Sequence, residues 1–88
     1  NIEALTGLTE LINLKLSENQ ISAIKPIEGL TKLQWLHLNG NQITGVRVLV
    51  PLENLQLLEL QENPIEAEKC PTERNMPNPL LRDFCKAL

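Results

Sequence analysis

The residue best suited to acid–base chemistry is His37, the only histidine of the 88-residue sequence. Lys15 precedes it by 22 residues and Glu59 follows it by 22 residues. A histidine beside a carboxylate can transfer protons in catalysis when a nucleophile lies within hydrogen-bond reach. No serine or cysteine occurs at this spacing, and Ser17 is displaced from it. We therefore predict no catalytic residue and no enzyme activity, and we interpret His37 as a polar side chain that helps to specify a partner.

Cys70 and Cys85 are the only cysteines. A zinc site needs three or four ligands, and the single histidine belongs to another part of the repeat, so we predict no metal ion and no cofactor. We favour a disulfide between the two cysteines, which would contribute about 3 kcal/mol and would place the protein in an oxidising, extracytoplasmic or secreted location. The alternative is two free thiols in a cytoplasmic protein, with Cys85 as a core residue of a helix.

The charged residues exclude several classes of partner. Glu62, Glu66 and Glu68, with Glu73 close in sequence, lack the spacing of a calcium loop, so we interpret them as a solvated acidic rim. The chain has 8 basic and 11 acidic side chains and a net charge of −3. Nucleic acids and anionic membranes need a concentrated basic face, and no apolar run is long enough to span a membrane. We expect neither nucleic-acid binding nor membrane insertion.

One pattern, L-x-x-L-x-L-x-x-N-x-I, occurs three times at a constant offset of 22 residues, starting at Leu11, Leu33 and Leu55. A fixed period of this length is typical of a stacked solenoid. Within each period, apolar residues two apart, such as Leu14 and Leu16, indicate a short strand. Later apolar residues are three apart, which favours 3₁₀ or irregular turns. We expect an α/β fold: a right-handed solenoid with a short parallel β-sheet on its concave face and 3₁₀ or irregular turns on its convex side.

The ends of the chain depart from the period, and we predict repeats over residues 1–65 and a C-terminal cap over residues 66–88. The first repeat is partial, because Ile2, Leu5 and Leu8 match only the later half of a period. This indicates either a piece of a longer array, which we favour, or a reduced cap. In the C-terminal cap we expect an irregular loop over residues 66–77, then a short helix with Asn78 as N-cap and Pro79 at the first helical position. Its apolar face is formed by Leu80, Leu81, Phe84, Cys85 and Leu88.

Asn19, Asn41 and Asn63 follow the three predicted strands at one offset. They should lie above one another at the bend, where backbone groups lack strand partners. We predict a structural ladder of asparagines rather than a ligand site.

The side chains between the inward leucines point outward and form columns, that is, residues at the same position of successive repeats. Neighbours in a column are about 5 Å apart. Trp35, the only tryptophan, lies beside Leu57, and an adjacent exposed pair of this kind is suited to anchor a partner. The columns are Asn13, Trp35 and Leu57; Lys15, His37 and Glu59; and Ser17, Asn39 and Gln61. We predict that all of these residues except Ser17 contact the partner.

The segments SENQISAIKPIEGL and LTKLQWLHLNGNQITGVRVLVP resemble the 22-residue leucine-rich repeats of the bacterial internalin-like class. The resemblance covers about residues 1–65. The ending, NPI followed by CP and a later cysteine, resembles the disulfide-bearing C-terminal ends of some secreted bacterial repeat proteins. The resemblance implies a curved solenoid that binds a protein on its concave face.

We therefore expect a protein-interaction module whose concave face presents Trp35 and Leu57. Two alternatives stay open. The first is a regulatory or targeting segment of a larger enzyme, with the chemistry on residues outside this sequence. The second is a structural fragment that self-associates through an uncapped N-terminal strand edge.

Overall fold

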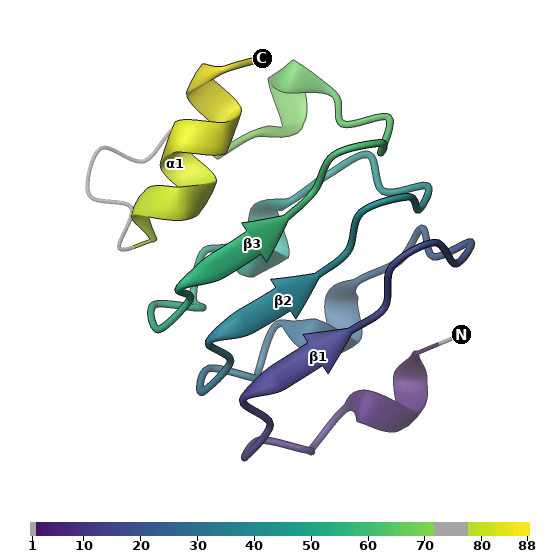
Figure 1. The fold of residues 1–88 in the computed structure, drawn as a ribbon, viewed down its shortest axis with the longest axis vertical. Helices are drawn as coiled ribbons and strands as arrows, with labels where there is room; N and C mark the ends of the chain where they lie inside the picture. Colours follow the sequence, from purple (N-terminus) through teal and green to yellow (C-terminus); the bar gives the residue numbers. More distant parts are fainter. Residues whose placement is uncertain (1, 72–77) are drawn as a thin grey trace.

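The computed structural model describes residues 2–71 and 78–88, and in them the chain winds into successive coils with a sheet on one side (Figure 1). Three strands pair in parallel in the order β1-β2-β3. They are β1 (Asn13–Lys15), β2 (Trp35–His37) and β3 (Leu57–Glu59). On the opposite side lie the 3₁₀ helices η1 (Glu3–Leu5), η2 (Lys25–Ile27), η3 (Arg47–Leu49) and η4 (Ala67–Lys69). Helix α1 (Pro79–Lys86) ends the chain and packs beside β3. The predicted solenoid, with its parallel sheet, 3₁₀ turns and C-terminal helix, is thus confirmed.

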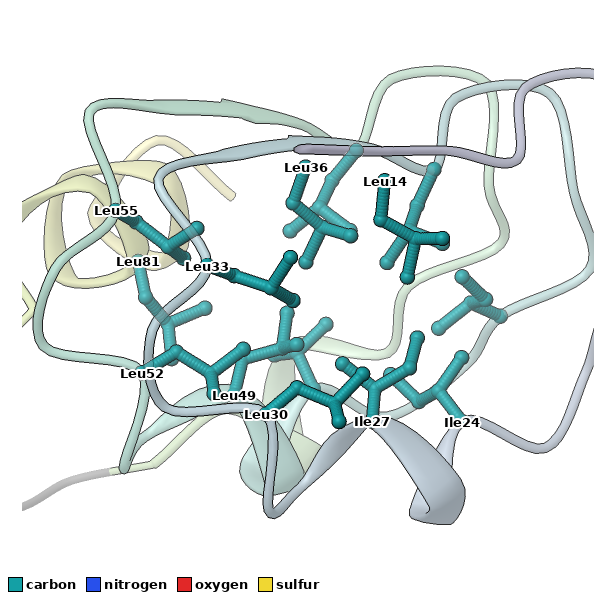
Figure 2. Packing of buried hydrophobic residues seen from close by; sticks show 14 of the residues in the cluster. Leu14, Ile24, Ile27, Leu30, Leu33, Leu36, Leu49, Leu52, Leu55 and Leu81 are labelled. Atoms are coloured by element: carbon teal, nitrogen blue, oxygen red, sulfur yellow. The ribbon is translucent and has the colours of Figure 1, made fainter. Parts of the chain in front are cut away.

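The apolar residues of the repeats fill the space between the strands and the 3₁₀ helices (Figure 2). Leu14 and Leu36 point inward from β1 and β2, toward Ile27 of η2 and Leu49 of η3. Each coil buries only part of a core by itself, so the stability of one coil depends on its neighbours. The buried apolar cluster consists of Leu14, Ile21, Ile24, Ile27, Leu30, Leu33, Leu36, Leu38, Ile43, Val46, Leu49, Leu52, Leu55, Leu60 and Leu81.

Three residues after the end of each strand, the backbone adopts a positive φ angle in the left-handed region. Glu18, Gly40 and Glu62 stand at the same position of successive coils and have φ angles of 56°, 74° and 61°. A Cβ atom on Gly40 would lie 3.3 Å from both the N and Cα atoms of Glu18. The central coil therefore needs glycine here, because the turn is left-handed and the preceding coil approaches closely.

The asparagines bind the backbone at this turn. Asn41 is buried; its Nδ2 donates to the carbonyls of Leu38 (2.8 Å) and Leu16 (3.0 Å). Its Oδ1 accepts from the backbone N–H groups of Asn19 and Ile21, each at 3.1 Å. The Asn41 side chain thus joins its own turn to the coil before it.

Asn63 also forms hydrogen bonds to the preceding coil, whereas Asn19 does not. Asn63 Oδ1 accepts from Ile43 N at 3.0 Å, and its Nδ2 donates to Leu38 O at 2.9 Å. Asn19 is exposed, and its Nδ2 donates only to carbonyls of its own turn, those of Leu16 and Ser17. Within the described residues, no strand and turn of a preceding coil lie beside Asn19, so its side chain binds only its own turn.

The C-terminal end is closed by α1. Asn78 caps the helix, accepting from Leu80 N and Leu81 N, and Leu81 is fully buried. A disulfide joins Cys70, directly after η4, to Cys85 in α1, as predicted. Leu88, expected on the buried face, is instead exposed, because α1 ends at Lys86 and the chain leaves the core.

The predicted irregular loop is wrong in its first part. Residues 67–69 form η4, and Glu66 N donates to Thr44 O at 2.9 Å, so coil packing continues past Ile65. The polar composition concealed this turn, because it lacks the apolar spacing of η2 and η3. Residues 72–77 of that loop, with Glu73, lie outside the described residues.

The N-terminal end is less covered than the rest of the core. Leu8 is 48% exposed, whereas its counterpart Leu30 in the next coil is 1% exposed. Ile2 and Leu5 are only partly buried. The equivalence with later coils predicts inward positions for all three, and the difference arises because no strand of the described residues lies beyond β1.

Candidate functional site

The outward side chains of the three strands form one surface, which we call the outer sheet face. In the observed register Asn13 pairs with Trp35 and Trp35 with Leu57, while Lys15 pairs with His37 and His37 with Glu59. The structure therefore brings together all the predicted partner-binding residues that lie within strands. The outer sheet face consists of Asn13, Lys15, Trp35, His37, Leu57 and Glu59.

Trp35 and Leu57 are the apolar part of the outer sheet face. They are 38% and 36% exposed, on strands that pair directly. Their backbone N–H groups donate to Ile12 O and Gln34 O, each at 3.1 Å. The parallel ladder fixes the backbone below both side chains, so they are held side by side before any contact with a partner.

The polar part is ordered by a contact between His37 and Glu59. His37 Nδ1 lies 2.7 Å from Glu59 Oε1, and both side chains are partly exposed. Because a carboxylate only accepts, Nδ1 carries the proton and donates it. Lys15 stands next to His37 on the other side and is exposed. This column thus places the Lys15 ammonium group beside the His37 imidazole, whose orientation is fixed by the Glu59 carboxylate.

The third predicted column, Ser17, Asn39 and Gln61, stays in line beyond the strand ends. Ser17 Oγ donates to Asn39 Oδ1 at 2.6 Å. The carbonyls of Asn39 and Gln61 accept from the residues that follow Ser17 and Asn39, at 2.8 and 3.0 Å. The hydroxyl of Ser17 is therefore engaged by an amide rather than by His37, and this arrangement is not that of an activated nucleophile.

The described part of the chain has neither a candidate metal cluster nor a candidate membrane-spanning helix. Within residues 2–71 and 78–88, no cluster of three or more His, Cys, Asp or Glu side chains could hold a metal ion. In the same residues, no helix has the length and apolar character needed to cross a membrane.

A concavity of about 760 Å³ is lined by residues of the segments 2–9 and 20–29. A second, of about 500 Å³, is lined partly by η2, η3 and η4. Neither borders the outer sheet face.

Ile12 is an exposed residue that the sequence reasoning missed. It is 46% exposed and lies next to β1, at the start of the ladder. A signal was present, because the same position of the next two repeats holds Gln34 and Gln56. An isoleucine where other repeats carry glutamine marks a surface that differs from its neighbours.

The comparisons with known proteins place the chain in a family. A family model described as leucine rich repeat matches residues 1–43 and 25–65. A search of curated proteins finds no match.

Three of the solved structures that match this chain illustrate the shared fold. An internalin (inlF) from Listeria monocytogenes is 36% identical with a TM-score of 0.76, covering 80% of this chain and 21% of that chain. An internalin C2 (inlC2) from the same organism is 41% identical with a TM-score of 0.70, covering 72% of this chain and 28% of that chain. A leucine-rich-repeat protein from Leptospira interrogans is 39% identical with a TM-score of 0.68, covering 78% of this chain and 18% of that chain. This chain thus spans between about a fifth and just over a quarter of their lengths. With three coils in register and a family match over most of its length, the chain belongs to the leucine-rich repeat family.

Proposed function

We propose that this chain is a protein-recognition module that binds a protein partner on the outer sheet face, without catalysing a reaction. The observation that carries the proposal is the exposed pair of Trp35 and Leu57 on neighbouring strands of a hydrogen-bonded sheet. Tryptophan is among the residues that contribute most to protein interfaces, and repeat proteins use the extended concave surface of the solenoid for binding.

The polar residues around the apolar pair serve specificity in this proposal. The His37–Glu59 contact fixes two polar side chains, while Lys15 offers a positive charge to a partner carboxylate. Such groups at the rim of an interface suppress wrong partners more than they add affinity. Because the ladder already orders the backbone, little conformational entropy is lost at this surface when the partner binds.

We also propose an extracytoplasmic or secreted location. The support is the Cys70–Cys85 disulfide, since structural disulfides are rare in reducing cytoplasms.

The test of the function compares two immobilised variants with the native chain. Trp35→Ala removes the central apolar side chain, and Val48→Ala is the control, since Val48 is a partly buried residue of η3 on the opposite side. A protein retained from extracellular fluid by the native chain and the control is purified and titrated against all three. We expect Trp35→Ala to weaken binding about 30-fold, equivalent to about 2 kcal/mol. Equal affinities for Trp35→Ala and the native chain, at equal melting temperatures, would refute the proposal.

A further inference from the structure

The second ring nitrogen of His37, Nε2, is an unused hydrogen-bonding group on the outer sheet face. Nδ1 lies 2.7 Å from Glu59 Oε1 and donates its proton to that carboxylate. In the neutral imidazole only one nitrogen carries a proton, so Nε2 has a free lone pair and accepts. Within the described residues Nε2 forms no hydrogen bond, and it is not among their buried unpaired atoms. Solvent therefore reaches an acceptor that is created by the contact with Glu59.

The sheet holds Glu59 where it can select this tautomer. His37 and Glu59 occupy paired positions of β2 and β3, so their side chains stand side by side on one face. They are 20% and 34% exposed, which leaves the pair partly shielded from water. Lys15 of β1 pairs with His37 from the other side, but an ammonium group has no acceptor for the Nδ1 proton. Glu59 is therefore the residue that fixes Nδ1 as the donor and Nε2 as the acceptor.

Apolar surface borders this acceptor. Trp35 and His37 are two residues apart on β2, so they point to the same face about 7 Å apart. Leu57 stands beside Trp35 on β3 and extends the apolar part. A group that covers both parts must be apolar over most of its length and must end in a hydrogen-bond donor. Tyrosine has this form, with an aromatic ring and a hydroxyl at its far end.

We propose that the outer sheet face binds a tyrosine side chain of its protein partner, with the ring on Trp35 and Leu57 and the hydroxyl donating to His37 Nε2. This inference rests on the proposed function and names the chemistry of the partner. A phenylalanine in the same place would cover Nε2 and leave it without a donor, which is unfavourable for a buried acceptor. Glu59 is a positioning residue, because it acts through the tautomer of His37.

The tautomer is measured first, in the isotope-labelled 88-residue chain. Long-range proton–nitrogen spectra at about pH 8 distinguish a protonated ring nitrogen from an unprotonated one. We expect Nε2 to be unprotonated in the native chain. Glu59→Gln should shift the population toward a protonated Nε2, because an amide can donate to Nδ1 as well as accept from it. A protonated Nε2 in the native chain would overturn the proposal.

The matched control for this variant is Glu62→Gln. Glu62 is an exposed residue of the turn after β3 and takes no part in the His37–Glu59 contact. The two variants therefore remove the same charge, but only Glu59→Gln changes the group that faces Nδ1. We expect Glu62→Gln to leave the tautomer of His37 as in the native chain.

The ligand probes are N-acetyltyrosinamide and N-acetylphenylalaninamide, which differ only in the hydroxyl group. Each is titrated into the chain while the signals of His37 Nε2 and the Trp35 ring are recorded. We expect the tyrosine amide to bind with a Kd of about 1 to 10 mM and the phenylalanine amide at least about 5-fold more weakly. This ratio should fall toward one in Glu59→Gln and stay unchanged in Glu62→Gln.

Equal affinities of the two probes for the native chain, or a ratio that Glu59→Gln leaves unchanged, would each overturn the proposal. Tighter binding of N-acetyltryptophanamide would assign the site to tryptophan and overturn it as well, as would absence of an Nε2 shift at about 10 mM. The proposed function fails by a different result, equal affinities of Trp35→Ala and the native chain for the purified partner, so the two failures are distinguishable. Circular dichroism confirms that each variant is folded.

Discussion

At the scale of single residues, position in the stack decides what a repeated side chain does. Asn19, Asn41 and Asn63 have the same place in their repeats, yet only the last two bind a preceding coil. Asn41 is buried and Asn19 is exposed. Loss of a buried hydrogen-bonding group leaves its former partners unsatisfied, whereas loss of an exposed one lets water replace it.

Asn41→Ala should therefore destabilise the chain by about 1–3 kcal/mol, because the backbone N–H groups of Asn19 and Ile21 lose their acceptor. Urea unfolding followed by circular dichroism measures the change. Asn19→Ala is the matched control and should cost less than about 1 kcal/mol. Equal losses for the two variants would contradict this interpretation of the ladder.

The sequence indicated the exposed tryptophan and the cysteine pair because each depends on a local signal. The constant offset placed Trp35 between inward leucines, and the composition left few alternatives for Cys70 and Cys85. The roles proposed for the outer sheet face stay predictions. Ile12 was missed because the spacing of the inward leucines says nothing about the residue just before a strand. Only a comparison with Gln34 and Gln56, which hold the same repeat position, shows that Ile12 is unusual.

At the scale of elements, the turn after each strand is the most constrained part of the coil. Its left-handed residue is glycine only in the central coil; Glu18 and Glu62 adopt the same conformation at a steric cost. The sequence concealed this requirement, because two of the three positions hold glutamate and only Gly40 signals it.

Gly40→Ala should lower stability by about 1–2 kcal/mol, since alanine disfavours a φ of 74° and its Cβ would crowd the backbone of Glu18. Glu62→Gly should raise stability by about 0.5–1 kcal/mol, because it relieves the same strain at an exposed site. Thermal melts compare the two variants with Glu53→Gly, a control whose φ is not positive. A Glu62→Gly chain that melts below the native one would show that Glu62 has a compensating contact.

The strands and 3₁₀ helices were predictable because their apolar spacings differ, two residues apart in a strand and three apart in a 3₁₀ turn. The turn at η4 was not predictable, because none of its residues, Ala67, Glu68 and Lys69, is buried. Its backbone is held by the coil before it, through Thr44. That contact is between segments distant in sequence, which no local pattern reports.

At the scale of the whole molecule, the coils share one core that is closed at one end. Helix α1 places Leu81 against the last coil, and the disulfide holds that helix to η4. A chain of 88 residues buries a modest part of its surface. A covalent link at the cap is therefore a large share of its total stability.

Replacing both cysteines, as Cys70→Ser with Cys85→Ser, should destabilise the chain by about 3 kcal/mol, the value expected for closing a loop of about 15 residues. Unfolding in urea with and without a reductant measures this. The native chain should lose stability on reduction, whereas the double variant should not respond. Two thiols titrating in the non-reduced native chain would remove the disulfide and, with it, the support for an extracytoplasmic location.

The outer sheet face could be predicted from the sequence. It follows from periodicity, because side chains alternate and strands align one repeat apart. The exposure of single residues such as Leu88 depends on how the assembled chain packs, and it appears only in three dimensions.

Paired residues of neighbouring strands are always 22 positions apart. A gene rearrangement that duplicates or deletes one such block rejoins the chain with every leucine, turn and asparagine still in register. Insertion of a single codon within a strand instead moves the following side chains to the opposite face. The length of this protein can therefore change during evolution in steps of one full coil, and each step adds or removes one row of outward-facing residues.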